Sequence, residues 1–157
     1  NKKKELSLMW NNLLFGLIIP LFILFFLYKR NPALVLLMYP LGVTIAYTAN
    51  DWGFDLFWEV EPDHKNPSLS AIPASLGYFP MITALFAFTR KKYPIHTLWH
   101  IFIYASVTTL TEGMMVLAGK VHYYNGWNIF FTFLIYVSGF ITVAVYTHIL
   151  WKYKVRF

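Results

Sequence analysis

The chain has 157 residues, of which 58% are hydrophobic and only 13% are charged, with a net charge of +6. Soluble domains carry about 25% charged residues, so this composition favours a membrane protein over a soluble domain. The absence of cysteine excludes disulfides, thiolate metal sites and cysteine nucleophiles. The basic residues form short clusters between apolar runs rather than one patch, which argues against a nucleic-acid partner.

Apolar segments follow one another along the whole chain. A helix needs about 20 apolar residues to cross a bilayer, and lipid forces the backbone to satisfy its own hydrogen bonds. The predicted spans are 6–27, 33–49, 69–89, 95–119 and 127–151, and the second helix has an alternative end at residue 60. We therefore expect a single all-α integral membrane domain over 1–157, a bundle of about five transmembrane helices.

The ends of this bundle differ in charge. The first span follows a basic stretch but has no small-residue cleavage pattern, so we expect a retained helix rather than a signal peptide. One predicted end carries eight basic residues and no acid: Lys29, Arg30, Arg90, Lys91, Lys92, Lys152, Lys154 and Arg156. The positive-inside rule predicts a cytoplasmic C-terminus, although the run Lys2, Lys3 and Lys4 argues for the opposite orientation.

Asp51, Asp55 and Glu59 recur every four residues after the second span. On a helix they would form one stripe, and their mutual repulsion would require a cation, a basic partner or water. The pattern predicts a cation or proton site, or an acid–base pair, at the outer membrane boundary. The alternative is an interfacial helix whose acids face water.

Glu112 lies inside the fourth span, where a carboxylate is costly unless it faces a partner or a cavity. Thr108 lies on the same side of that helix, and a second polar stripe that includes Thr132 and Tyr136 follows the fifth span. Together the stripes predict a cavity that opens outward, with Tyr124 at the same end and His122 there as a proton partner of Glu112. The alternatives are hydrogen bonds that join helices, and a loop residue without a role at His122.

These features give the following functional predictions. The leading hypothesis is binding or transport of a cation or a small amphipathic molecule around Glu112. One alternative is a membrane enzyme that acts on a lipid or isoprenoid, with Glu112 and Asp51 or Asp55 as acid and base. Another is a structural subunit of a membrane complex. The predicted ligand-binding residues are Asn50, Asp51, Asp55, Glu59, Thr108, Glu112, His122 and Tyr124.

Phosphate-binding, dinucleotide-binding and zinc motifs are missing from the sequence, so we expect no cofactor. The expected partners are membrane lipids, a small-molecule or cation ligand, and a membrane-protein partner or a second copy of the chain.

Three short motifs carry a family resemblance: Asn-Asp-Trp-Gly-Phe-Asp at 50–55, Glu112-Gly113, and Tyr-Asn-Gly-Trp at 124–127. With these motifs the chain resembles an uncharacterised family of small multi-pass membrane proteins found in spore-forming firmicutes. The resemblance covers most of the chain. It implies a bacterial plasma membrane and no particular activity.

Overall fold

The computed structural model describes residues 2–54, 56–62 and 67–155. Within them, five helices are long and apolar enough to cross a membrane: Met9–Arg30, Pro32–Gly53, Ser68–Lys92, Thr97–Leu117 and Ile129–Lys152. The prediction of an all-α bundle of five membrane-spanning helices is confirmed.

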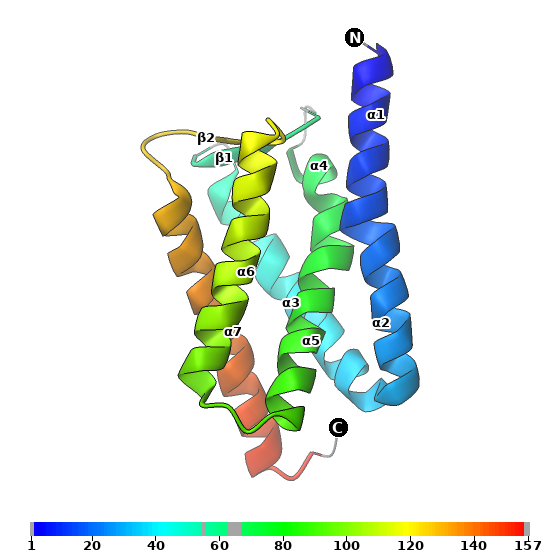
Figure 1. Ribbon diagram of the computed structural model, residues 1–157, viewed down its shortest axis with the longest axis vertical. Coiled ribbons are helices and arrows are strands. Elements are labelled where there is room, and N and C mark those ends of the chain that lie inside the picture. Colours follow the sequence, from blue (N-terminus) through cyan, green and yellow to red (C-terminus); the bar gives the residue numbers. More distant parts are fainter. Residues whose placement is uncertain (1, 55, 63–66, 156–157) are drawn as a thin grey trace.

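Two of the spans change helix type along their length. The elements in chain order are α1 (Lys2–Leu13), the π-helical η1 (Leu14–Ile18), α2 (Ile19–Arg30), α3 (Pro32–Gly53), β1 (Trp58–Val60), α4 (Pro67–Pro73), the π-helical η2 (Ala74–Tyr78), α5 (Phe79–Lys92), α6 (Thr97–Leu117), β2 (Val121–Tyr123) and α7 (Ile129–Lys152). The first span joins α1, η1 and α2, and the third joins α4, η2 and α5 (Figure 1).

The third span lies at the centre of the bundle. Of its most apolar stretch, 56% is buried inside the bundle, whereas 17% to 28% of the corresponding stretch is buried in the other four spans. Its α5 segment contacts α2, α3, α6 and α7, and α6 packs along α7. The described N-terminal and C-terminal ends of the chain lie at opposite ends of the bundle (Figure 1).

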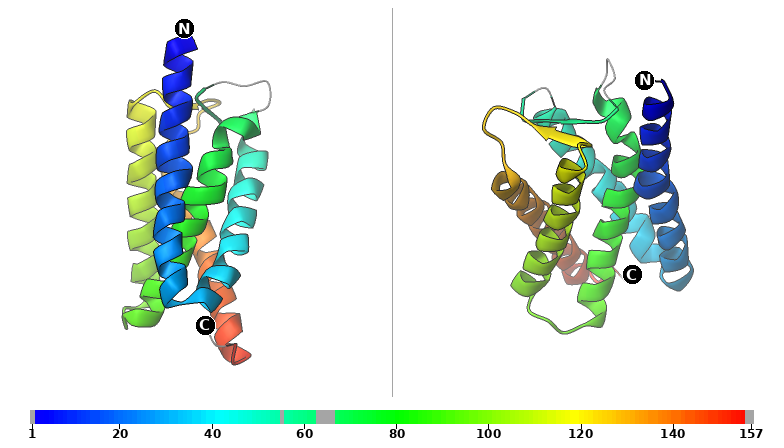
Figure 2. Two further views of the ribbon diagram at one scale, coloured as in Figure 1. Left: turned by 90° about the vertical axis from the view of Figure 1, so that its right-hand side faces the viewer. Right: turned by 45° about the horizontal axis from the view of Figure 1, so that its top comes forward.

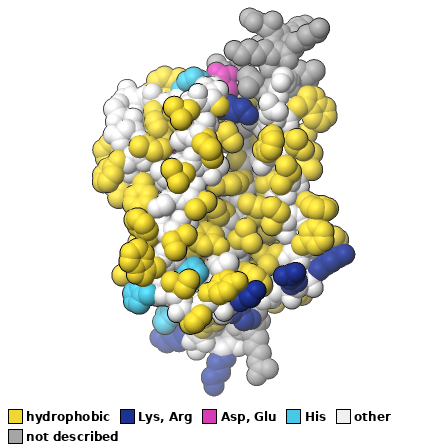
Figure 3. All heavy atoms as spheres, viewed as in Figure 1, with side chains coloured by type: hydrophobic (Ala, Val, Ile, Leu, Met, Phe, Trp, Pro, Cys, Tyr) yellow, Lys and Arg dark blue, Asp and Glu magenta, His cyan; other side chains and the backbone are white. Residues whose placement is uncertain are grey.

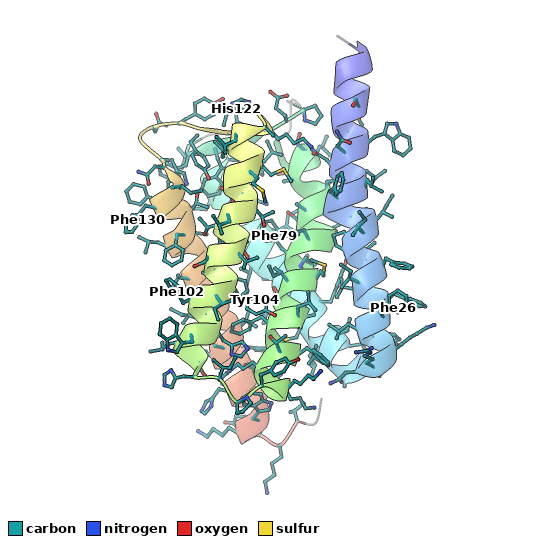
Figure 4. All side chains as sticks on the ribbon, viewed as in Figure 1. Phe26, Phe79, Phe102, Tyr104, His122 and Phe130 are labelled. Carbon is teal, nitrogen blue, oxygen red and sulfur yellow. The ribbon has the colours of Figure 1, made fainter. Side chains whose placement is uncertain are left out.

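The outer surface of the bundle is apolar. Phe26, Phe102 and Phe130 point outward from α2, α6 and α7 (Figure 4), and each is at least half exposed. Hydrophobic side chains cover the middle of the face seen in Figure 3, while Lys and Arg side chains gather at its lower end. This distribution is typical of helices that face lipid, with charges at the membrane boundary.

Glycine allows the helices to approach closely at two crossings. The π-helical segments η1 and η2 lie side by side, and a Cβ added at Gly77 would collide with the carbonyl oxygen of Gly16 and lie 2.7 Å from the Cα of Leu17. At the second crossing, a Cβ at Gly42 would lie 2.6 Å from the Cα of Pro80. Small residues at helix contacts are a common means of packing in membranes.

The second span ends earlier than its predicted alternative end. Helix α3 continues past residue 49 but stops at Gly53, and Phe54 has an extended backbone with φ −62° and ψ 149°. The indole of Trp58 occupies the space beside Gly53 where a side chain would otherwise lie. The extension to residue 60 is therefore wrong, because the chain turns back at Gly53 and residues 58–60 pair as a strand.

Candidate functional site

A small β-sheet covers the N-terminal end of the bundle. Strands β1 and β2 pair antiparallel, with the register Trp58 to Tyr123, Glu59 to His122 and Val60 to Val121. Backbone hydrogen bonds extend the pairing on both sides, from Glu61 N to Lys120 O and from Tyr124 N to Phe57 O, each 2.8 Å long. We call residues 56–62 and 118–128 the cap. Figure 2 shows its two strands lying across the ends of the helices.

Beneath the cap is a cavity of about 220 Å³, bounded by α3, α5, α6 and α7 and reaching η1. The cap contributes its roof, which includes Trp58, Val60 and Trp127. Most of the wall is apolar, and its polar side chains include Asn12, Asn50, Glu112, Lys120 and Thr132. The volume exceeds that of engineered apolar cavities of about 150 Å³ that bind benzene, so a small molecule fits.

Glu112 is the charged centre of the cavity wall, and hydroxyl groups hold its carboxylate. Tyr123 donates to Oε1 at 2.5 Å and Thr132 donates to the same oxygen at 3.2 Å. Tyr136 donates to Oε2. These donors come from β2 and α7, so the carboxylate joins three elements at the cap end of the bundle.

The indole of Trp127 fixes the direction of this network. Its Nε1 can only donate, and it donates to Thr132 Oγ1 at 2.9 Å. The Thr132 hydroxyl must then direct its own hydrogen elsewhere, and its acceptors are Tyr123 at 3.0 Å and Glu112. The network therefore runs from an indole donor to a carboxylate acceptor.

Tyr123 remains a hydrogen-bond donor over the physiological pH range. Burial raises the pKa of its phenol, and the nearby charge of Glu112 and the hydrogen bond to that carboxylate raise it further. A phenol with a raised pKa keeps its proton, so the Tyr123 hydroxyl can donate to Glu112 whenever the carboxylate is ionised.

An aromatic cluster forms the roof above this network. Trp52, Phe57, Trp58 and Trp127 contact one another, with ring centroids 4.8 to 6.4 Å apart. Trp52 lies at the end of α3, whereas the other rings belong to the cap. The cluster thus fastens the cap to the helix end over the cavity.

Three of the predicted site residues line the cavity: Asn50, Thr108 and Glu112. Asn50 donates to Ser75 Oγ at 3.0 Å, which links α3 to η2. Thr108 is buried and donates to the carbonyl of Tyr104 within its own helix, at 2.8 Å. The predicted polar stripes on the fourth and fifth spans do face one cavity, since Thr132 and Tyr136 line it as well.

Other predicted residues lie on the outer surface at the same end. Asp51 is exposed at the end of α3, outside the cavity wall, and Asp55 lies outside the described residues. Glu59 accepts a hydrogen bond from the Tyr124 hydroxyl at 2.8 Å. The predicted acidic stripe does not form, because Asp51 belongs to a helix and Glu59 to a strand.

His122 also points away from the cavity. Its Nε2 lies 3.6 Å from Glu61 Oε1, and its side chain is 45% exposed. Figure 4 places it beside the strands at the end of the bundle. His122 therefore pairs with Glu61 across the cap and does not contact Glu112 as the predicted proton partner.

Sequence reasoning missed Tyr78, Tyr123 and Trp127 as site residues. In the structure Tyr123 follows the alternation of β2, because His122 is exposed while its neighbours Val121 and Tyr123 are half-buried. A strand of only three residues gave no signal for this in the sequence. Tyr78 lies in η2 and lines the same cavity as Glu112, Thr108 and Thr111. Tyr78 and Glu112 are far apart in the sequence, so no local pattern indicated that they line one cavity.

Comparisons of the chain with protein-family models, with curated proteins and with solved structures find no match. The resemblance to the firmicute family stays a prediction. The functional argument therefore depends on the geometry of the cavity.

Proposed function

We propose that this integral membrane protein binds a small amphipathic molecule in the cavity under the cap, with Glu112 as the polar anchor. The observation that carries the proposal is one hydrogen-bonded carboxylate at the cap end of a mostly apolar cavity. Ligand sites in proteins are typically apolar, with a few placed polar groups that fix orientation. Binding is a step that a transporter and a non-transporting binding protein share.

An amphipathic ligand fits better than a bare metal ion. Metal sites for hard cations use several oxygen ligands, usually with more than one carboxylate. Within the described residues, no group of three or more His, Cys, Asp or Glu side chains is placed to hold a metal. Glu112 contributes one carboxylate to a wall that is otherwise largely apolar.

Binding also fits better than acid–base catalysis by two carboxylates. Such catalysis needs a second carboxylate that faces the same substrate as Glu112. Among the described residues, Glu112 is the only Asp or Glu that lines the cavity, and Asp51 is exposed outside its wall; Asp55 lies outside the described residues. The presence of the cavity around Glu112 supports binding more than it supports a purely structural role.

The distribution of basic residues supports an orientation in the membrane, and the family resemblance supports a location. Seven described basic residues lie at the end opposite the cap: Lys29, Arg30, Arg90, Lys91, Lys92, Lys152 and Lys154. We propose that this end, with the C-terminus, is cytoplasmic and that the cap faces outward. The resemblance to the firmicute family supports a bacterial plasma membrane.

The test is thermal stability of the purified protein in a nonionic detergent, with and without added decanol or a bacterial lipid extract. A ligand that binds only the folded state raises the melting temperature. We expect a rise for the wild type and a smaller rise for Glu112→Gln. The control is Asp51→Asn, which removes an exposed carboxylate outside the cavity and should leave the rise undiminished. Equal rises in the wild type and Glu112→Gln would remove Glu112 as the anchor.

A further inference from the structure

We infer that the ligand of this cavity presents an ammonium group to Glu112 and places a short apolar tail among the helices. This inference rests on the proposed function and specifies the chemical class of the ligand. Four features of the cavity carry it: the acceptors left on Glu112, the charge of its partners, the aromatic wall and the apolar depth.

The carboxylate has room for one more donor. An ionised carboxylate offers about four acceptor positions, two on each oxygen. The hydroxyls of Tyr123, Thr132 and Tyr136 fill at most three of these positions, because each carries one hydrogen. At least one acceptor position is therefore left on Glu112, whose side chain lines the cavity. The head group that binds there must therefore carry a hydrogen-bond donor.

The partners of Glu112 do not offset its charge. They are three neutral hydroxyl groups. Among the described residues the ion pair joins Glu61 to His122 on the cap. Lys120 lines the same cavity, but it forms no ion pair with Glu112 in the part of the chain that the structure describes. A carboxylate inside a membrane span is costly without a countercharge. A cationic head group would supply that countercharge, and a neutral alcohol would not.

Aromatic rings line the same cavity as Glu112. Trp58, Tyr78, Phe79, Trp127 and Tyr136 all line the cavity. The faces of aromatic rings attract organic cations, and ammonium groups are often recognised by several rings together. This wall suits an ammonium group, which needs few direct ligands, better than a metal ion.

The deeper wall sets the size of the tail. Gly42, Ala46, Ile82, Phe140 and Val143 line the cavity farther from the cap. Scaling from benzene in a cavity of about 150 Å³, this volume of about 220 Å³ holds roughly nine non-hydrogen atoms. A straight-chain amine of about eight carbons is the simplest probe with both properties.

Lys120 makes the test discriminating, because it lines the same cavity and carries the opposite charge. A ligand with a carboxylate head would be drawn to Lys120 rather than to Glu112. Three probes with eight carbons each therefore separate the alternatives: octylamine with a cationic head, octanol with a neutral head, and octanoate with an anionic head.

The experiment measures the affinity of each probe for the purified wild type at pH 7 in a nonionic detergent, by titration calorimetry. We expect octylamine to bind about tenfold or more tightly than octanol, the advantage of a charge-assisted hydrogen bond over a neutral one. Glu112→Gln should remove this advantage, whereas Asp51→Asn should retain it. The ratio in the wild type tests the inference even if Glu112→Gln does not fold.

The other outcomes are distinct. Equal affinity for octylamine and octanol would overturn the ammonium inference and leave the proposed function standing. Tightest binding of octanoate, lost in Lys120→Gln, would overturn the inference and assign an anionic ligand to the same cavity. Binding of none of the three probes, together with no stabilisation by decanol or lipid extract, would overturn the proposed function as well.

Discussion

The hydrogen bonds to Glu112 join residues that are distant in the sequence. Tyr123 is 11 residues away from Glu112, and Tyr136 is 24 residues away. A carboxylate left without donors in a membrane span pays a large desolvation penalty, so these hydroxyls stabilise the folded bundle as well as shaping the site. Glu112 therefore has a structural role in addition to its proposed role in binding.

Tyr136→Phe tests that structural role. The variant keeps the ring but removes the hydroxyl that donates to Oε2. A hydrogen bond to a charged group contributes about 1.5–3 kcal/mol, so we expect the free energy of unfolding to fall by about that amount. Unfolding in mixed detergent micelles measures it. The control is Tyr153→Phe, because Tyr153 is 72% exposed, and an equally large loss there would contradict the assignment.

Glu112 was predictable from the sequence because a carboxylate in an apolar span is rare and easily recognised. Thr132 and Tyr136 were predictable as one polar stripe, since helical spacing brings them to one face. Tyr123 was not predictable as a donor, because its position depends on a strand of three residues that forms through pairing with β1. So short a strand has little propensity of its own to reveal it.

At the scale of elements, the close crossing of η1 and η2 depends on glycine. A Cβ at position 77 would collide with the backbone at Gly16, and backbone atoms cannot move aside as a flexible side chain can. The two π-helical segments must therefore separate if Gly77 gains a side chain, and both segments contribute to the cavity wall.

Gly77→Ala should accordingly destabilise the protein by about 1–3 kcal/mol, the usual effect of overpacking. The matched control is Gly113→Ala, because a Cβ there would lie 3.6 Å from Ile129 Cδ1 in ordinary contact. Alanine favours a helix over glycine, so the control should be neutral or stabilising. Thermal unfolding of both variants measures the difference, and similar melting temperatures would contradict the crossing.

The cap is the element that sequence reasoning described wrongly. The acids at positions 51, 55 and 59 have helical spacing, but spacing alone does not keep a chain helical. Trp58 packs on Gly53, and β1 gains its hydrogen bonds from β2, about 60 residues later in the chain. These long-range contacts outweigh the local pattern, and no local signal in the sequence indicates them.

At the scale of the whole molecule, the number and approximate limits of the spans were predictable because each depends on a continuous apolar run. The order of packing was not predictable. The third span is central because it contacts the helices on all sides, and its small residues fit there: Ala84 and Ala87 are fully buried between neighbours. Hydropathy alone does not distinguish a central helix from a peripheral one.

The absence of cysteine makes the orientation directly testable. Leu56→Cys places a single thiol at the cap, and Ile95→Cys places one in the connection between α5 and α6 at the opposite end. Both positions are about half exposed. We expect a membrane-impermeant maleimide, added to intact cells, to label Leu56→Cys and to label Ile95→Cys only after permeabilisation. The reverse pattern would place the C-terminus outside.

The pairing of β1 with β2 also constrains how the protein is made. Strand β1 leaves the ribosome after the second span, but its partner follows the fourth. During synthesis the roof over Glu112 cannot close until four spans have entered the bilayer and the segment after α6 has reached the same side as β1. Tyr136 arrives later still, on the final span. The site is therefore completed at the last step of membrane insertion, so a chain truncated before α7 would leave Glu112 in the bilayer without its donors from that helix.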